Sequence, residues 1–458
     1  MAIVPPALLQ SLQHLPGFDA QAFIDVHAQE EKITSIRVNP LKFTNDDLTS
    51  IGGGIANTSE LVPWSRWGHY LPERPSFTFD PLFHAGCYYV QEASSMFLEQ
   101  AITQLAILDQ PLKVLDLCAA PGGKSTHLQS LISKESLLVS NEVIRQRAGI
   151  LRQNMTKWGG ANVVVTANDP QHFARLEGFF DVLVVDAPCS GSGLFRRDPE
   201  AINEWSPDAV QLCCGRQRRI LSDALPCLAA GGLLVYSTCS YSAEEDEAIA
   251  DWLVEEWGLE NLSLEVAESW GVVRSQSPNT GSVGYRFFPD QVKGEGFYLA
   301  CFRKGSGGAS RYKTTKPEAA SSAEKAAVAP WIAAGDFSIL KEGFLYALPA
   351  PLLEAFSIIK ANLYVQQAGV RLGEVMKGKL VPDHALALSE IITPHLTATD
   401  LELPEAIKYL QRLDLSVQPE QRGWQLARFG GHNLGWMNAL GNRINNYYPK
   451  EFRILKQA

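Results

Sequence analysis

Two cysteines that follow strand-like apolar runs are the residues of this chain best suited to covalent chemistry. Cys189 lies in Asp186-Ala-Pro-Cys-Ser-Gly-Ser-Gly193, after the apolar run 180–185, and Cys239 lies in Tyr236-Ser-Thr-Cys-Ser-Tyr241, after the run 232–236. In an open α/β sheet, ligands bind at the carboxyl ends of the strands. A free cysteine is often only a small buried hydrophobic residue. The strand-end positions and the turn-forming Pro-Cys-Ser-Gly favour two thiols in one site, one of them a nucleophile.

A loop of small residues follows an earlier apolar run. It reads Leu115-Asp-Leu-Cys-Ala-Ala-Pro-Gly-Gly-Lys-Ser-Thr126. Small residues before a helix start allow backbone N–H groups to approach a ligand closely. The ending Gly-Lys-Ser is also that of a phosphate-binding P-loop, but Cys118 stands where that motif needs glycine, and Gly-x-Gly-x-x-Gly is absent. Neither nucleotide hydrolysis nor a standard dinucleotide site is therefore predicted.

Acidic residues follow four successive strand-like runs. They are Asp116, Glu142, Asp169 and Asp186. In a doubly wound sheet, an acid after the second strand commonly accepts hydrogen bonds from ribose hydroxyls, which is the position of Glu142. Asp169 is placed to meet an adenine amino group. The four acids together predict a cofactor that carries a nucleoside.

The elements that must position these groups alternate between strands and helices. Strands are predicted at 114–117, 137–140, 163–166, 182–185 and 233–237, and helices at 125–131, 143–158 and 208–228. This alternation predicts an α/β fold with a parallel sheet and right-handed crossovers. Ser242-Ala-Glu-Glu245 has the spacing of a capping box, so the acidic run 244–247 is interpreted as structural. The aromatic segments 285–288 and 296–302 predict a closing antiparallel pair.

Composition shifts divide the chain into four segments. Residues 305–330 are rich in Gly, Ser, Ala, Thr and Lys and predict a flexible linker. The domain after the linker spans 331–458. A softer boundary near residue 75, at Leu71-Pro-Glu-Arg-Pro75, separates an N-terminal segment (1–75) from the catalytic segment (76–304).

The overall composition is that of an ordinary globular protein. The chain has 458 residues, 46% of them hydrophobic and 20% charged, with a net charge of −10 and eight cysteines. No Cys-x-x-Cys occurs, so neither a disulfide framework nor a metal site is expected. Without a signal peptide or an apolar run long enough for a membrane, we expect a cytoplasmic protein. The negative net charge does not exclude nucleic acid, because binding depends on the local patch.

The motifs in combination resemble those of the RNA cytosine-5 methyltransferases (the NOL1/NOP2/Sun family). The resemblance covers residues 30–304 and rests on Leu-Asp-Leu-Cys-Ala-Ala-Pro-Gly-Gly-Lys, Asp-Ala-Pro-Cys-Ser-Gly-Ser-Gly and Ser-Thr-Cys-Ser. Segments 369–374, 382–386, 434–436 and 443–449 are similar to the C-terminal extension of a bacterial member that acts on 16S rRNA. One departure is Gly435-Trp-Met-Asn438, where a more basic run is expected.

The resemblance implies a class I (Rossmann-like) S-adenosylmethionine-dependent methyltransferase domain. A small α+β N-terminal RNA-binding segment and a C-terminal PUA-like domain would flank it. The implied partner is rRNA, either 16S rRNA or the 30S subunit, with no membrane, and the protein is expected to be a monomer. Expected RNA contacts are Arg196, Arg197 and Arg443, and the stretch Tyr88-Tyr-Val-Gln-Glu92 lines the base pocket or packs a helix.

The resemblance also implies roles for single residues. Cys239 is the nucleophile, Cys189 acts as a base or in product release, and Asp186 contacts N3 of the cytosine. Lys124 and the helix N-terminus help to hold Cys239 as a thiolate. Glu142 binds the ribose hydroxyls and Asp169 the adenine side, while Asp186 also lies beside the cofactor. The cofactor loop consists of Cys118, Ala119, Ala120, Pro121, Gly122, Gly123 and Lys124.

Both cysteines have a task in this chemistry. A thiolate that adds to C6 of cytosine makes C5 able to accept a methyl group, and the C5 proton must then leave before the enzyme is released. The base must also be turned out of its stack. In the DNA cytosine-5 methyltransferases the nucleophile is the cysteine of a Pro-Cys dipeptide, which here is Cys189. Two further alternatives are a tRNA substrate and a non-catalytic ribosome-assembly factor on the same scaffold.

Overall fold

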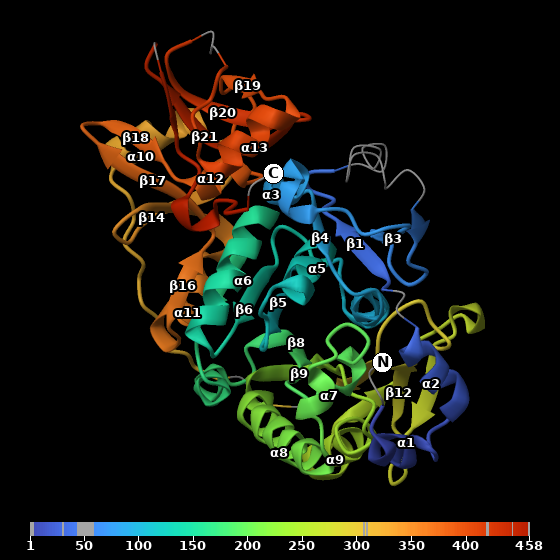
Figure 1. Ribbon diagram of the computed structural model, residues 1–458. Helices are drawn as coiled ribbons and strands as arrows, with labels where there is room; N and C mark the ends of the chain where they lie inside the picture. The colour runs from blue at the N-terminus through green and yellow to red at the C-terminus, as the bar shows by residue number, and fades with distance from the viewer. Residues whose placement is uncertain are drawn as a thin grey trace.

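The computed structural model is organised around a ten-stranded mixed sheet (Figure 1). It describes residues 4–29, 32–43, 59–305, 307, 310–417, 421–441 and 443–456, so parts of the predicted N-terminal segment and linker lie outside the described residues. The strand order is β11-β12-β13-β9-β8-β5-β6-β7-β16, with β10 paired to β13. The five parallel strands are β5 (Lys113–Asp116), β6 (Leu137–Asn141), β7 (Val163–Thr166), β8 (Phe180–Asp186) and β9 (Leu228–Thr238).

The middle of this sheet contains the point where the strand order reverses. β5 pairs with β6 on one side and with β8 on the other, and both pairings are parallel. At such a point the two following loops diverge and leave a crevice at the carboxyl edge. The sheet therefore has the architecture of a class I methyltransferase, which confirms the predicted α/β fold class.

Four antiparallel strands complete one side of the sheet. The predicted aromatic pair forms as expected, with Tyr285 opposite Leu299. The bounds are β10 (Glu260–Leu262), β11 (Val273–Gln276), β12 (Val283–Phe287) and β13 (Phe297–Arg303).

Helices cover both faces of the sheet. Buried residues of α4 (Leu98–Leu105), α5 (Gly123–Leu131) and α6 (Arg145–Trp158) pack on one face. Those of α8 (Pro207–Ala224), α9 (Glu247–Trp257) and α11 (Leu353–Asn362) pack on the other. Gly159, at φ +92°, ends α6 in the left-handed conformation that glycine adopts without strain, as the sequence predicted. The predicted helix 208–228 ends earlier, at Ala224, because Pro226 cannot continue it.

The N-terminal region has a helical part and a small sheet. Helices α1 (Pro6–Leu12) and α2 (Ala20–Ala28) pack against Tyr241 and Phe288 of the catalytic region. The four-stranded sheet has the order β2-β3-β1-β4. Its strands are β1 (Thr34–Val38), β2 (Glu60–Leu61), β3 (Gly68–Leu71) and β4 (Tyr88–Val90), with the short helix α3 (Pro81–Ala85) before β4.

The C-terminal region forms two further sheets at the opposite end of the molecule from α1 and α2 (Figure 1). The first contains β14 (Phe337–Lys341), β15 (Leu345–Pro349), β17 (Val370–Met376) and β18 (Lys379–Pro382). The second contains β19 (Ala398–Asp400), β20 (Gly423–Phe429), β21 (His432–Ala439) and β22 (Ile444–Asn446). Helices α12 (His384–Leu388) and α13 (Leu403–Gln411) lie among them, and α7 (Ala201–Glu204) belongs to the catalytic region.

The C-terminal region is joined to the rest of the chain more closely than the composition indicated. The stretch predicted as a linker contains helix α10 (Ser322–Val328), and Ser321 and Glu324 form a capping box at its start. Strand β16 (Val365–Ala368) adds to the catalytic sheet antiparallel to β7. Buried residues of α13 and β21 also share a core with β1 and α3. No helix of the described ranges is long and apolar enough to cross a membrane.

Candidate active site

The two thiols singled out in the sequence lie side by side. Cys189 follows β8 and Cys239 follows β9, and these neighbouring strands pair in parallel with Asp186 opposite Ser237. Because the strands end at the same edge, the Sγ atoms approach to 3.1 Å. Both side chains are half-buried, as is Cys118, whereas the other five cysteines are buried. The site therefore combines two accessible sulfurs in contact.

One buried carboxylate holds the two cysteine loops together. Glu245 Oε1 accepts hydrogen bonds from the Ser190 N–H at 2.8 Å and from Gln217 Nε2 at 3.1 Å. Its Oε2 accepts from the hydroxyl of Ser190 at 2.5 Å and from that of Ser240 at 2.6 Å. Ser190 follows Cys189 and Ser240 follows Cys239, so Glu245 connects the residues next to both thiols.

This arrangement corrects the capping box expected for Ser242-Ala-Glu-Glu245. Helix α9 begins later, at Glu247, and no side chain caps its start. The Glu245 carboxylate turns instead toward the strand ends, where four donors converge. The sequence alone did not show whether Glu245 caps the helix that follows it or accepts hydrogen bonds from the serine residues of the cysteine loops, because both lie within its reach.

The surroundings of Cys189 weaken its acidity. The hydrogen bond to Cys239 and then burial raise the pKa of Cys189 well above the ordinary value for a thiol. A nearby carboxylate, Glu245, acts in the same direction. The raised pKa favours the protonated form of Cys189, and either sulfur can be the donor in its contact with Cys239.

The small-residue loop leads from β5 into α5. Gly122 adopts φ +118° before the first turn, a conformation that L side chains rarely take. Side chains of α6 hold the loop carbonyls: Arg147 Nη2 donates to Ala120 O at 3.0 Å, and Asn154 Nδ2 donates to Pro121 O at 2.8 Å. The first-turn N–H groups of α5 have no intrahelical acceptor, so they form a donor-rich end suited to a polar or anionic ligand.

Lys124 and Asp186 form an ion pair at the same edge. Lys124 Nζ lies 2.8 Å from Asp186 Oδ2, and Asp186 Oδ1 accepts from the Ser237 hydroxyl at 2.7 Å. Burial alone lowers the pKa of Lys124, but the neighbouring Asp186 raises it, so the ammonium form is favoured. The Asp186 side chain stays 34% exposed and so remains available to a ligand.

Asp116 is buried beneath the loop. Its Oδ2 accepts a hydrogen bond from the Ser125 hydroxyl at 2.6 Å, while no described residue donates to Oδ1. Burial raises the pKa of Asp116 to about 7. The side chain thus offers one unused acceptor position beneath the cofactor loop.

The remaining strand-end acids stand further along the edge. Glu142 Oε1 accepts from the Ile144 N–H at 2.9 Å, and its Oε2 lies 3.6 Å from Arg147 Nη1. Asp169 accepts from the Gln171 N–H and lies 4.0 Å from Arg219 Nη1.

A pocket brings part of the expected set together. Four of the expected residues do not line this pocket: Glu142, Asp169, Cys189 and Cys239. It is lined by Tyr89, Val90, Gln91, Glu92, Ser95, Cys118, Ala119, Ala120, Pro121, Gly123, Lys124, Asp186 and Arg197.

Arg37 connects the N-terminal segment to this pocket. It is fully buried, and its Nε donates to Gln91 Oε1 at 2.8 Å while Nη2 donates to Thr126 Oγ1 at 2.6 Å. The guanidinium also lies over the Trp158 ring, 4.5 Å from its centroid. Burial lowers the pKa of Arg37 to about 9. Arg37 therefore positions α5 and Gln91.

The three arginines expected to contact RNA are in different environments. Arg196 is buried and donates to Gly294 O at 3.2 Å, which holds a loop in place and does not present the guanidinium to a phosphate. Arg197 is exposed and lines the pocket. Arg443 is exposed beside β22.

Three family models match the chain. Residues 103–303 match the model described as 16S rRNA methyltransferase RsmB/F, residues 4–93 the N-terminal domain of 16S rRNA methyltransferase RsmF, and residues 397–454 the RsmF PUA domain.

Curated relatives match over almost their full length. The chain is 30% identical over 440 residues to ribosomal RNA small subunit methyltransferase F of Aeromonas salmonicida, covering 91% of this chain and 90% of that protein. It is 29% identical over 441 residues to the protein of the same name from Shewanella amazonensis, covering 91% of each.

Solved structures share the central part of the fold. A methyltransferase homologue from Pyrococcus horikoshii is 30% identical with a TM-score of 0.53, over 66% of this chain and all of that one. NSun6 from the same organism has a TM-score of 0.55 at 19% identity, over 67% of this chain and all of that one. With its methyltransferase sheet, its small-residue loop and a relative that is 30% identical over 91% of the chain, the protein belongs to the RsmB/F family of 16S rRNA methyltransferases.

Proposed function

We propose that this protein transfers a methyl group from S-adenosylmethionine to C5 of a cytosine in 16S rRNA through a covalent bond between Cys239 and C6. Membership of an rRNA methyltransferase family supports the general reaction. The observation that carries the specific proposal is the 3.1 Å contact between the sulfurs of Cys189 and Cys239 at the edge that also holds Lys124 and Asp186.

The residues of the cofactor edge fit S-adenosylmethionine. The free N–H groups at the start of α5 and the unused Asp116 Oδ1 suit the two charged groups of its amino-acid part. Cys118 through Lys124 would surround this part, Glu142 would accept from the ribose hydroxyls, and Asp169 would face the adenine. When bound, the cofactor supplies an electrophilic methyl group.

Cys239 acts as the nucleophile in this proposal. Its thiolate adds to C6 of the cytosine, and the electron pair of the C5–C6 double bond then forms a bond from C5 to the methyl carbon. The bond between that carbon and the sulfonium sulfur would break at the same time and leave a neutral thioether. Asp186, fixed by Lys124 and Ser237, contacts the N3 side of the ring. To offset the negative charge that develops on the ring, its carboxyl group must take up a proton from solvent and share it with N3.

Cys189 completes the cycle. After methyl transfer, the C5 proton leaves to a base, the C5–C6 double bond forms again, and the Cys239–C6 bond breaks. The raised pKa of Cys189 makes its thiolate a strong base once formed, and its contact with Cys239 places it beside the bond that must break. A Cys189 that starts protonated must first release its proton to solvent, because the sulfur of Cys239 is bonded to C6 when the base is needed.

RNA recognition would involve residues in two regions. Arg197 lines the pocket that also contains Lys124 and Asp186, which we call the catalytic pocket, and Arg443 lies in the region matched by the PUA domain. The relatives named for small-subunit rRNA favour 16S rRNA over tRNA. Whether Arg443 touches RNA is part of this proposal.

Methylation with labelled S-adenosylmethionine and single cysteine variants tests the proposal. Cys239→Ala should abolish methyl transfer, and Cys189→Ala should accumulate a covalent protein–RNA adduct. An adduct that forms with Cys239→Ala instead would exchange the two roles. Naked 16S rRNA, 30S subunits and tRNA are compared as substrates, and bisulfite sequencing of the rRNA locates the product.

Calorimetry with S-adenosylmethionine separates an enzyme from a binding protein on the same scaffold. Measurable affinity is expected, and its loss in Asp116→Asn would support the role of the unpartnered oxygen. A wild-type protein without affinity for the cofactor would contradict the proposal.

A further inference from the structure

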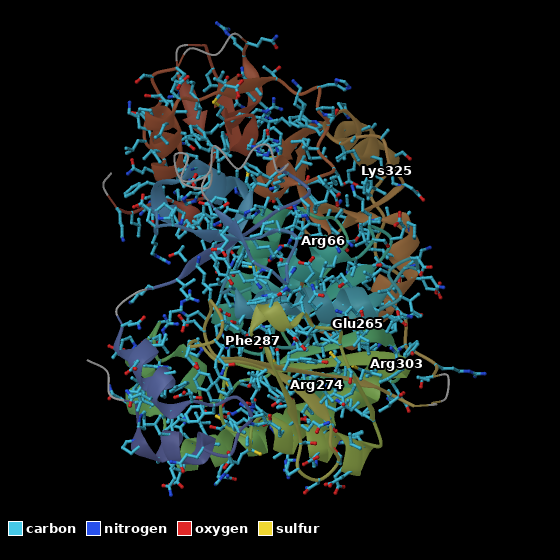
Figure 2. All side chains as sticks on the ribbon, turned by 90° about the vertical axis from the view of Figure 1, so that its right-hand side faces the viewer. Arg66, Glu265, Arg274, Phe287, Arg303 and Lys325 are labelled. Carbon is cyan, nitrogen blue, oxygen red and sulfur yellow. The ribbon has the colours of Figure 1, made fainter. Side chains whose placement is uncertain are left out.

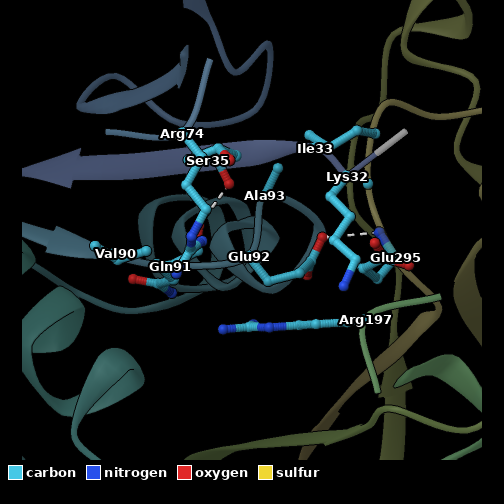
Figure 3. Close-up of a pocket in the computed structure, with 12 residues that line it drawn as sticks. Lys32, Ile33, Ser35, Arg74, Val90, Gln91, Glu92, Ala93, Arg197 and Glu295 are labelled. Atoms are coloured by element: carbon cyan, nitrogen blue, oxygen red, sulfur yellow. Dashed lines mark hydrogen bonds between the residues drawn. The ribbon is translucent and has the colours of Figure 1, made fainter. Parts of the chain in front are cut away.

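A second cavity adjoins the catalytic pocket and has no role in the mechanism above. Its volume is ≈ 360 Å³, within the range of about 300–1,000 Å³ that is typical of ligand sites. Its walls come from residues 32–35, 90–93 and 294–295, together with Arg74 and Arg197 (Figure 3). Val90, Gln91, Glu92 and Arg197 line both cavities, so the two form one continuous depression.

The acidic and amide groups of this cavity are already occupied. Glu92 accepts the backbone N–H groups of Ser94, Ser95 and Glu295 at 2.8, 2.9 and 2.9 Å. Gln91 accepts from Arg37 at 2.8 Å and donates to Ser95 at 3.2 Å.

Glu295 carries less negative charge than an exposed carboxylate would. Burial raises the pKa of its carboxyl to about 7, and Arg196 Nη1 lies 3.7 Å from it. Each acid of the cavity thus already has partners, Glu92 in three backbone N–H groups and Glu295 in Arg196.

The cations of the cavity have weaker partners: Lys32 and Arg197 interact electrostatically with Glu295, and the Arg74 guanidinium lies over the Phe77 ring, 5.2 Å from its centroid. Lys32, Arg74 and Arg197 are exposed, and within the described part of the chain none of the three forms an ion pair with a carboxylate. They come from three separate segments, and Figure 3 shows Arg197 extended below Gln91 and Glu92 while Arg74 enters from the opposite side. Unpaired cations around a continuous groove favour an anionic ligand that also enters the catalytic pocket.

We propose that this cavity receives the nucleotide next to the target cytosine, with Arg74, Lys32 and Arg197 holding its phosphate and Arg197 marking the junction between the two nucleotides. This inference rests on the proposed function, since a strand whose base enters the catalytic pocket must continue along the depression. Enzymes that turn a base out of its stack commonly contact the flanking nucleotides. No aromatic side chain lines the cavity, so stacking falls to the planar guanidinium groups.

The test measures the binding of the full-length protein to a short single-stranded RNA with one cytosine. Arg74→Met and Lys32→Met remove cations that lie outside the catalytic pocket. Lys325→Met is the control, because that exposed lysine of α10 (Figure 2) is not among the residues that line the cavity. Each pocket variant should weaken binding about tenfold. Each should also reduce the slope of log affinity against log salt concentration by about 0.7, the value for one lost contact with a single strand.

A second arm locates the contact on the RNA. Replacing one phosphate beside the cytosine with an uncharged methylphosphonate should weaken binding to the wild-type protein more than binding to Arg74→Met, which has already lost one of the three cations on that phosphate. The substitution is made on the 5′ side and on the 3′ side in turn, and an effect confined to one side identifies the neighbour that occupies the cavity.

The outcomes separate this inference from the proposed function. Unchanged affinity and salt slope in both pocket variants, or an equal loss in Lys325→Met, would overturn the inference while methylation persists. Salt-dependent binding through Arg74 without any 5-methylcytosine would instead contradict the proposed function, and with it the assignment of the cavity to the neighbour of a target cytosine, while still supporting RNA binding in the cavity. A wild-type protein that binds neither this RNA nor 16S rRNA would overturn both.

Discussion

The clearest perturbation is the removal of Glu245, the carboxylate that connects the two cysteine loops. In Glu245→Ala the hydroxyls of Ser190 and Ser240 rotate to other partners, but the Ser190 N–H and one Gln217 N–H lose their acceptor. A buried donor without a partner costs about 1–3 kcal/mol. Gln217 keeps a bond to Pro188 O at 3.2 Å, and burial of the carboxylate is itself unfavourable, as the raised pKa of Glu245 shows. We therefore expect a loss of about 2–3 kcal/mol in the free energy of unfolding.

The effect on catalysis should exceed the effect on stability. Without the carboxylate, the residues next to the two cysteines lose their shared acceptor, although the Gly193 N–H still donates to Cys239 O at 2.9 Å and the Tyr241 N–H to the Ser192 hydroxyl oxygen at 2.9 Å. A displacement of about 1 Å can cost about 10²-fold in rate. We expect kcat to fall by about that factor while the KM for RNA changes little, because the RNA-binding cations are elsewhere. Glu245→Gln, with one acceptor oxygen, should lie between the wild type and Glu245→Ala.

The assay compares single-turnover methylation and urea unfolding of the Glu245 variants. Glu244→Gln is the matched control, since the neighbouring Glu244 is half-exposed and takes no part in the network; it should stay within about 0.5 kcal/mol of the wild type. A folded Glu245→Ala protein that methylates at the wild-type rate would refute the positioning role, as would an equal loss in Glu244→Gln.

Three further predictions concern the surroundings of the site. Gly193→Ala would place a Cβ 2.5 Å from Gly296 O and 2.8 Å from Cys239 O. Urea unfolding should therefore show a loss of about 1–3 kcal/mol in the free energy of unfolding, and methylation should slow. The control is Gly215→Ala, whose Cβ would have no atom within 4 Å and should not destabilise the protein. Arg286→Met would leave Asp246 and Glu247 buried without their cation and the Tyr241 carbonyl without the Arg286 donor. The loss should be about 3–5 kcal/mol in the free energy of unfolding, measured by heat or urea. The control Arg274→Met, at an exposed position of β11, should be neutral. Burial alone would raise the pKa of Glu99, but hydrogen bonds from His127, Ser65 and Arg66 lower it to about 2. The stability that this group contributes is therefore present above pH 4.5 and lost as the pH falls toward 2. Glu99→Gln should flatten the curve of stability against pH in this range, and an unchanged curve below pH 4.5 would contradict the assignment.

The chain itself determined the catalytic sheet and the content of its carboxyl edge. Apolar runs of strand length, each followed by a turn and a helix, specify parallel strands because only burial on both faces accommodates them. The predicted strands 114–117, 182–185 and 233–237 end within one residue of the observed ends of β5, β8 and β9, which are Asp116, Asp186 and Thr238. Since parallel strands end at one edge, the residues after them were bound to be neighbours. That is why both cysteines could be assigned to one site.

The tertiary structure decided which partners those residues take. The sequence predicted that Glu245 caps a helix, yet its carboxylate accepts four hydrogen bonds between the cysteine loops. The sequence also predicted that Arg196 contacts RNA, yet its side chain is buried against Gly294. The addition of β16 to the catalytic sheet was likewise outside any local pattern. Hydrophobic period and turn chemistry act over a few residues, whereas the partner of a buried polar group is set by segments tens or hundreds of positions away. The chain thus specified where the chemistry gathers, and packing specified how the two thiols are held 3.1 Å apart.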